Sequence, residues 1–220
     1  TERDPERVSS WHLVGVFLQD SGDWLAADPC FDQVQRRDLS QSDALFRRAQ
    51  IQARAGRPGD AQWLLQQVLH HQPDAQPAQT LMAQVLLDMR QANEARRLLL
   101  YWLRTMPRHS ERWRLLAIAH QQCNRPMLAR RALQRALRLD PDNIEAMRLL
   151  AWVALAQNDH PAAVHIANQL LARRPDDIST QIQAAFVHAM AGDCALAARC
   201  AEQAVAQTPQ DAEAWRALSQ

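Results

Sequence analysis

The sequence contains no lysine and only five glycines among its 220 residues. The glycines do not form a glycine-rich phosphate loop, which disfavours phosphate-binding chemistry of that kind. No apolar run reaches about 18 residues and no signal-peptide pattern is present, so we expect neither a membrane span nor an export signal within this segment.

Cysteine and histidine are too scattered to suggest a metal site or a disulfide framework. The four cysteines are Cys30, Cys123, Cys194 and Cys200. They include no CxxC pair, and we interpret them as buried, inert thiols. The eight histidines do not form a ligand set, and no Ser/His/Asp or Cys/His grouping is apparent. We therefore expect no metal, no cofactor and no catalytic activity within these residues.

Charge is nearly balanced, with 25 basic against 24 acidic residues and a net charge of +1. This balance gives no global reason to expect nucleic-acid or membrane binding, so a charged partner must be recognised by a local patch. Hydrophobic residues make up 47% of the chain, which is enough to bury a continuous core.

Proline marks an internal repeat of 34 residues. That interval connects Pro73, Pro107, Pro141, Pro175 and Pro209. Taking each proline as position 32 of a unit sets repeats at 42–75, 76–109, 110–143, 144–177 and 178–211. A repeat of this length is one supersecondary unit that buries its apolar surface against its neighbours. The period therefore decides the fold before any other feature of the sequence.

Alanine occupies two positions of all five repeats. Position 8 holds Ala49, Ala83, Ala117, Ala151 and Ala185, and position 20 holds Ala61, Ala95, Ala129, Ala163 and Ala197. Helices that pack about 8–10 Å apart need a small side chain where their axes approach most closely. The two positions therefore predict two antiparallel helices in each repeat.

Three further features predict where these helices end. Position 15 holds Gly56, Arg90, Asn124, Asn158 and Gly192, which favours a left-handed residue at the end of the first helix, with Arg90 as the departure. Positions 24 and 27 are apolar and form a stripe along the second helix at i, i+3 spacing. The proline at position 32 stops that helix, because it lacks an N–H and clashes with the preceding turn.

Together these positions resemble the tetratricopeptide repeat. The best match is carried by Trp113, Leu116, Ala117, Ala129, Leu133, Ala136, Asp140 and Pro141. The resemblance implies an all-α fold, a right-handed α-solenoid of antiparallel helix pairs whose first helices line an inner wall where partners bind. We expect residues 1–220 to form a single array of this kind.

The frame extends beyond the five clear repeats. Residues 8–41 fit as a degenerate first repeat, although Asp28-Pro29 falls inside its second helix. We predict that this helix is restarted or shortened there, with Asp28 as N-cap and Pro29 as the first helical residue. Residues 212–220 begin a further repeat or a capping helix and stop in mid-helix, so we expect the chain to be part of a longer array.

In the family that the sequence resembles, positions 2, 5, 9, 12 and 13 of the first helix face the inner wall. The candidate groove at such positions consists of Arg114, Ile118, Gln121, Arg148, Trp152, Leu155, Phe186 and Met190. An apolar floor edged by two arginines and a glutamine favours a protein or peptide segment with apolar anchors and a carboxylate. The alternative is that these residues cover one another or a terminal helix, and that glutamates at position 2 neutralise the arginines.

A second candidate is a basic patch, because twelve arginines lie between residues 90 and 138 against only two glutamates. Its members at outer positions of the second helices are Arg97, Arg104, Arg131, Arg135 and Arg138. Local clustering of this kind fits an acidic partner even when the net charge is near zero. A solvated outer face is the alternative, and we expect no nucleic-acid partner.

We predict a non-catalytic scaffold that binds segments of partner proteins, within a larger bacterial export, secretion or complex-assembly protein, for example one for polysaccharide export. The use of arginine alone is typical of a GC-rich genome and supports a bacterial source; the periplasm and the cytoplasm both stay open. Two alternatives remain, a substrate-docking or regulatory domain of a larger enzyme such as a glycosyl- or sulfotransferase, and a secretion chaperone.

Overall fold

The computed structural model describes residues 5–37 and 42–207, and within these residues it contains twelve α-helices and no strand. The predicted start of a further repeat, at 212–220, lies outside them. The chain divides into two compact units, residues 1–99 and 100–220, and each is described by itself. None of the described helices is long and apolar enough to cross a lipid bilayer.

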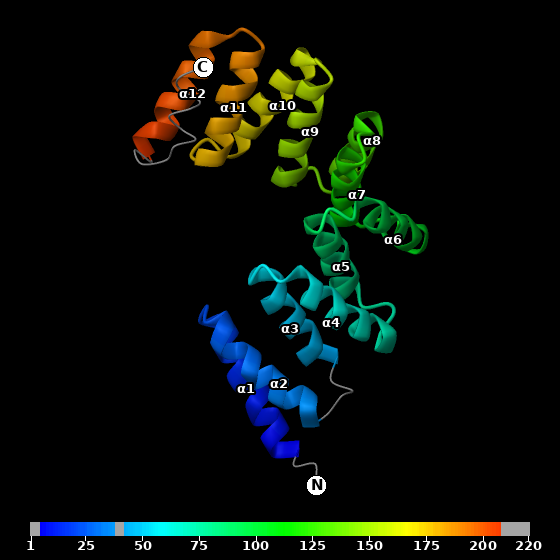
Figure 1. Ribbon diagram of the computed structural model, residues 1–220. Coiled ribbons are helices and arrows are strands. Elements are labelled where there is room, and N and C mark those ends of the chain that lie inside the picture. Colours follow the sequence, from blue (N-terminus) through cyan, green and yellow to red (C-terminus); the bar gives the residue numbers. More distant parts are fainter. Residues whose placement is uncertain (1–4, 38–41, 208–220) are drawn as a thin grey trace. The chain divides into compact units, whose positions relative to one another are not determined.

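The helices follow one another with short turns (Figure 1). The first unit holds α1 (Pro5–Asp20), α2 (Trp24–Arg37), α3 (Ser42–Arg54), α4 (Pro58–His71), α5 (Gln76–Asp88) and the first part of α6 (Ala92–Thr105). The second unit holds the end of α6, α7 (Ser110–Gln122), α8 (Pro126–Leu139), α9 (Ile144–Ala156), α10 (His160–Arg173), α11 (Ile178–Met190) and α12 (Cys194–Gln207). The architecture is an all-α solenoid of helical repeats.

The helices repeat with the period of the sequence. From α3 onward the first helices are 13 residues long and begin at residues 42, 76, 110, 144 and 178, each 34 after the last. The second helices are 14 residues long and begin at residues 58, 92, 126, 160 and 194. Helices α4, α6, α8 and α10 each end two residues before the proline of their repeat, because proline lacks the N–H that would continue the helix.

Within each unit, helices pack against their sequence neighbours. The two helices of a pair contact each other in α1–α2, α3–α4, α7–α8, α9–α10 and α11–α12. First helices of neighbouring pairs also touch, α3 against α5 in one unit and α9 against α11 in the other. Side chains on α9 and α11 are therefore brought together on one face of the second unit.

The alanine positions are buried where the helices meet, as predicted. All ten alanines at positions 8 and 20 are at most 6% exposed. The left-handed residues also occur as predicted, at Gly56, Arg90, Asn124, Asn158 and Gly192, and Gly22 adds the same conformation to the first pair. Arg90 is no exception, because its φ of 60° matches that of the two asparagines. The packing of the repeat thus imposes the turn even where the side chain disfavours it.

The prediction that the helix restarts at Pro29 is wrong. Helix α2 runs without a break from Trp24 to Arg37, and Asp23 rather than Asp28 caps it, since its carboxylate accepts from the backbone N–H of Ala26 at 3.2 Å. Proline at this point removes the partner of one carbonyl, that of Leu25. Both the proline and the Leu25 side chain are exposed, so water can replace the lost N–H.

Packing on the opposite side keeps this helix continuous. Ala27, Phe31 and Val34 are fully buried on one face of α2, before and after the proline. Asp28 is used between helices instead of as a cap, because its carboxylate accepts from Arg48 at 3.2 Å and from Gln52 at 3.2 Å on α3. The tertiary contacts therefore outweigh the local preference of the Asp-Pro sequence.

Helices α1 and α2 approach each other closely through a different combination of residues. Gly15 occupies position 8 of the frame, where the five later repeats have alanine, and a Cβ built on it would lie 2.8 Å from the ring of Phe31. Phe31 is fully buried and occupies position 24 of the frame, where the next three repeats have Leu65, Leu99 and Leu133. The larger aromatic ring is accommodated because the facing residue has no side chain.

Gly15→Ala should therefore destabilise the first unit, although alanine favours helix by about 1 kcal/mol. We expect a net loss on the order of 1 kcal/mol, because overpacking a core costs about 1–3 kcal/mol. The double variant Gly15→Ala/Phe31→Leu should regain stability relative to Phe31→Leu alone, because it recreates the combination of alanine at position 8 and leucine at position 24 that the next three repeats have. Urea unfolding followed by circular dichroism measures both effects. Additive behaviour of the two substitutions would contradict this account.

Candidate partner-binding site

The predicted groove residues all lie on first helices of the second unit. Arg114, Ile118 and Gln121 are on α7, Arg148, Trp152 and Leu155 on α9, and Phe186 and Met190 on α11. Three of them, Arg148, Trp152 and Phe186, line one pocket of about 330 Å³ between α9 and α11. We call this the α9–α11 pocket.

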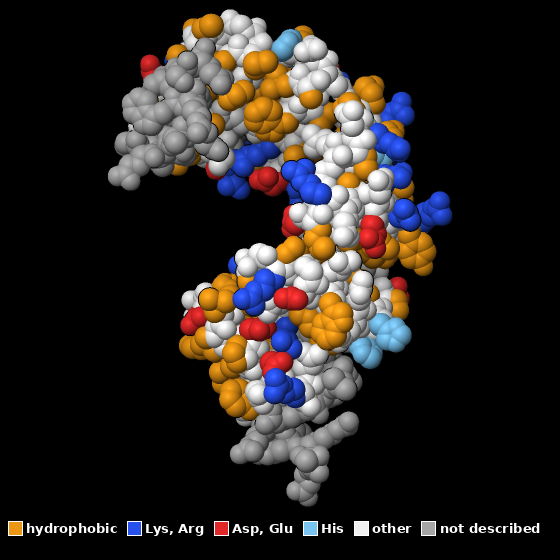
Figure 2. Space-filling model, viewed as in Figure 1, with side chains coloured by type: hydrophobic (Ala, Val, Ile, Leu, Met, Phe, Trp, Pro, Cys, Tyr) orange, Lys and Arg blue, Asp and Glu red, His pale blue; other side chains and the backbone are white. Residues whose placement is uncertain are grey.

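An aromatic pair forms one wall of this pocket. The ring centroids of Trp152 and Phe186 are 5.6 Å apart, with the ring planes inclined by 55°. Trp152 is 42% exposed, so part of its apolar ring faces solvent. Figure 2 shows hydrophobic side chains over α9, α10 and α11, with basic and acidic side chains along their lower edge. The wall is therefore an apolar surface available to a partner.

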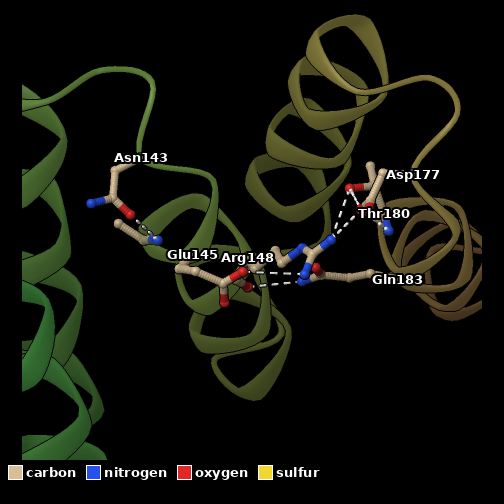
Figure 3. Close-up of polar contacts among 7 residues, drawn as sticks. Asn143, Glu145, Arg148, Asp177, Thr180 and Gln183 are labelled. Atoms are coloured by element: carbon tan, nitrogen blue, oxygen red, sulfur yellow. Dashed lines mark hydrogen bonds and ion pairs between the residues drawn. The ribbon is translucent and has the colours of Figure 1, made fainter. Parts of the chain in front are cut away.

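Arg148 connects α9 to the beginning of α11 (Figure 3). Its guanidinium donates to Glu145 at 3.3 Å, to the carboxylate of Asp177, and to the hydroxyl of Thr180 at 3.2 Å. Gln183 donates in turn to the backbone carbonyl of Arg148 at 2.8 Å. Because Asp177 is the N-cap of α11, these contacts fix the side chain of Arg148 against the start of that helix.

The Asp177 carboxylate is stabilised in its charged form. Thr180 donates to it through its hydroxyl at 2.6 Å and through its backbone N–H at 2.9 Å. These hydrogen bonds, aided by the positive charge of Arg148, lower the pKa of Asp177 below its ordinary value. The junction of α9 and α11 therefore depends on an ionised carboxylate.

Acid should weaken this junction. A carboxylate with a lowered folded-state pKa stabilises the fold fully above the unfolded pKa of about 3.9, and this stability is lost as the pH falls through the folded value. Asp177→Asn keeps a capping side chain and removes the titration. Between about pH 5 and pH 2 the wild type should lose more unfolding free energy than the variant. Equal losses, measured by urea unfolding at each pH, would contradict the role of Asp177.

The remaining predicted groove residues lie outside this pocket. Arg114 makes a bidentate ion pair with Glu111 on its own helix, at 2.8 and 2.5 Å, which neutralises it. Leu155 packs against the buried core of α9 to α12. Ile118 and Gln121 are half-buried on α7, whereas Met190 is 55% exposed at the end of α11.

Sequence reasoning missed several residues that complete the pocket. Leu149, Ile178 and Ile182 add apolar surface, and Ser179 and Gln183 add polar groups. Ile182 occupies position 5 of repeat 178–211, the position of Arg114 and Arg148 in the two preceding repeats. Applying the inner-wall role of position 5 to the last repeat would have predicted Ile182. Ser179 would have been found in the same way, because it occupies position 2 of that repeat, another inner-wall position. Leu149, Ile178 and Gln183 depend on how α9 and α11 face each other, which a single repeat does not show.

The predicted basic patch is divided between the units. Arg97 belongs to the first unit, and Arg104, Arg131, Arg135 and Arg138 belong to the second. All five are exposed. Arg131, Arg135 and Arg138 line a common pocket at α8, whereas Arg104 is not among the residues that line it.

The cysteines differ in exposure. Cys30 and Cys200 are buried, and burial raises the pKa of both thiols, whereas Cys194 is exposed. Cys123 is half-buried, so the interpretation of all four as buried holds for Cys30 and Cys200 and is wrong for Cys123 and for Cys194, which begins α12. The described residues contain no group of three or more histidine, cysteine or acidic side chains placed to hold a metal ion.

Family comparison identifies the class of protein. One model of the tetratricopeptide repeat matches residues 18–78, 114–178 and 187–220, and a second matches residues 52–119. The first of these covers most of the chain. The chain therefore belongs to the tetratricopeptide-repeat family, whose members are generally non-catalytic scaffolds that bind protein or peptide partners.

Solved structures share this fold at low sequence identity. PilW, a widely conserved type IV pilus biogenesis factor, is 17% identical with a TM-score of 0.85 over 96% of this chain and 98% of that chain. PilF of Pseudomonas aeruginosa is 18% identical with a TM-score of 0.76 over 97% of each chain. YrrB, a tetratricopeptide-repeat protein with an unusual peptide-binding site, is 16% identical with a TM-score of 0.61, over 86% of this chain and 98% of that chain. No curated protein matches the chain in sequence.

Proposed function

We propose that the chain holds a segment of a partner protein at the α9–α11 pocket, with a bulky apolar side chain of the partner placed beside Trp152 and Phe186. The aromatic pair, in which Trp152 is exposed and Phe186 is half-buried, is the observation that carries this proposal. Replacing a buried aromatic anchor by alanine causes some of the largest losses of binding free energy at protein interfaces. A pocket of about 330 Å³ accommodates one large side chain of a peptide.

Polar groups around the pocket give the ligand its second feature. Arg148 is held in place by Asp177 and Thr180, while its bond to Glu145 is longer and Glu145 has a side chain that is 62% exposed. A carboxylate of the partner replaces Glu145 on Nη1 of Arg148, while Nη2 keeps its contacts to Asp177 and Thr180. The proposed ligand is therefore a segment that carries an apolar anchor next to a carboxylate.

The cellular setting that we propose is the assembly of a bacterial export or surface machine. Support comes from the similarity of fold to PilW, a type IV pilus biogenesis factor. YrrB supports the use of such an array for peptide binding. In this setting the chain positions one component of a complex for another.

Panning of a random 12-residue peptide display library on the full chain tests the proposal. The selected peptides should carry a bulky apolar residue near an acidic one. Their affinity should fall by about tenfold or more in Trp152→Ala/Phe186→Ala, because hot-spot truncation costs about 2 kcal/mol or more. Trp63→Ala is the matched control, since Trp63 is 57% exposed on α4 of the other unit. Unchanged affinity in the double variant, with its helical signal intact, would overturn the site.

The carboxylate part of the proposal has a separate test. Glu145→Gln removes the competing acid and should strengthen binding of the selected peptides, while peptides with their acid changed to the amide should gain nothing from it. Isothermal titration calorimetry compares the four combinations. Equal effects of Glu145→Gln on both kinds of peptide would contradict the exchange on Arg148.

A further inference from the structure

The second unit has another pocket, formed by α8 with the end of α6 and with α7. Its volume is about 380 Å³. Apolar walls are supplied by Trp113, Leu116 and Leu128, and the rim by Arg131, Arg135 and Arg138. We call this the α8 pocket. It shares no lining residue with the α9–α11 pocket.

The three arginines form a stripe along α8. Their spacing of i, i+4 and i+7 places them on one face of the helix. Figure 2 shows basic side chains gathered over this part of the molecule. No acidic residue lines the α8 pocket in the described part of the chain, so the stripe carries uncompensated positive charge.

A fourth arginine of the same helix shows the contrast. Arg130 points toward the next pair of helices, where it forms an ion pair with Asp159 at 2.8 Å and donates to Gln157 at 3.1 Å. Within the described residues, no ion pair involves Arg131, Arg135 or Arg138. The arginine that contacts the next pair of helices is therefore neutralised by an acidic residue, whereas the three arginines of the stripe have no acidic partner among the described residues.

Such a stripe opposes helix formation slightly, since like charges one turn apart cost about 0.2–0.5 kcal/mol per pair. Only Arg138, in the last turn, has a compensating interaction with the C-terminal end of the helix dipole. An external acid removes the repulsion and gains charge-assisted hydrogen bonds, for which the guanidinium is well shaped.

The apolar walls narrow the choice of ligand. The indole N–H of Trp113 donates to the backbone carbonyl of Pro107 at 2.8 Å, which holds the ring at the pocket. Leu100 and Leu128 also line the pocket and remain 39% and 38% exposed. The arginines alone would be enough to bind a polyanion such as RNA. The apolar lining of the pocket instead favours a ligand that also has an apolar side chain.

We propose that the α8 pocket binds an acidic segment of a partner protein, with one bulky apolar side chain inside the pocket and flanking carboxylates on the arginine stripe. This site is separate from the α9–α11 pocket. The chain would then hold two segments at once, and loss of either site leaves the other able to bind.

Fluorescence anisotropy with a labelled peptide tests the proposal. The probe has three glutamates, one phenylalanine and three further glutamates, and two control peptides replace phenylalanine by alanine or every glutamate by glutamine. We expect the probe to bind the full chain at micromolar to millimolar concentration and both control peptides to bind about tenfold or more weakly. No binding at millimolar probe would overturn the proposal.

Variants of the chain locate the binding. Arg131→Gln/Arg135→Gln/Arg138→Gln should weaken the probe about tenfold or more, since three ion pairs are lost. The matched pair Arg135→Gln and Arg130→Gln removes the same charge from the same helix, and only the first should matter. The probe also has the apolar residue and carboxylates that we propose for the ligand of the α9–α11 pocket, so each of these variants is compared in the Trp152→Ala/Phe186→Ala background. Probe binding should persist in that background and be lost with the arginines of the stripe, which separates the α8 pocket from the α9–α11 pocket.

Two results would contradict the acidic-segment site. Equal losses in Arg135→Gln and Arg130→Gln would show a general effect of charge. The second is equal affinity for the probe, for the control peptide with alanine in place of phenylalanine, and for a poly-uridylate oligonucleotide. That result would show a surface that binds any polyanion.

Discussion

Close approach of neighbouring helices is the constraint on which this structure depends. Alanine at two positions of every clear repeat lets the two helices of a pair meet without a wedge, and all ten of these alanines are buried. In the first pair the same approach is reached by Gly15 against Phe31. With the helices of a pair this close, first helices of neighbouring pairs can touch, as α9 and α11 do. Only then do side chains 34 residues apart, such as Trp152 and Phe186, come into contact.

Polar contacts then fix one pair against the next. Arg148 reaches from α9 to Asp177, the N-cap of α11, so an ion pair is added to a capping interaction at the junction. The proposed ligand site lies directly beside this junction, where Trp152 and Phe186 form its wall. A rigid junction keeps the aromatic pair in place and lowers the entropy lost on binding.

The repeat frame, the helix boundaries and the buried stripe follow from the sequence, because period and residue size are local properties that recur five times. Contacts between repeats are harder to predict from the sequence. Arg148 is identified by its position, but its bond to Asp177 links residues 29 apart and requires the packing of α9 on α11. Pro29 shows the reverse case, since buried neighbours override a strong local signal. The pocket at α8 required knowing which arginines lack an acid, and Arg130 looks the same as Arg131 in the sequence.

The measurement that tests the central constraint most directly is the melting temperature of Ala151→Leu compared with Ala156→Leu. Both alanines are on α9, but Ala151 is fully buried at the approach of the helices and Ala156 is exposed at the end of the helix. Overpacking costs about 1–3 kcal/mol, so Ala151→Leu should lower the melting temperature by about 2–12 °C while Ala156→Leu leaves it nearly unchanged. Equal melting temperatures for the two variants would contradict the account.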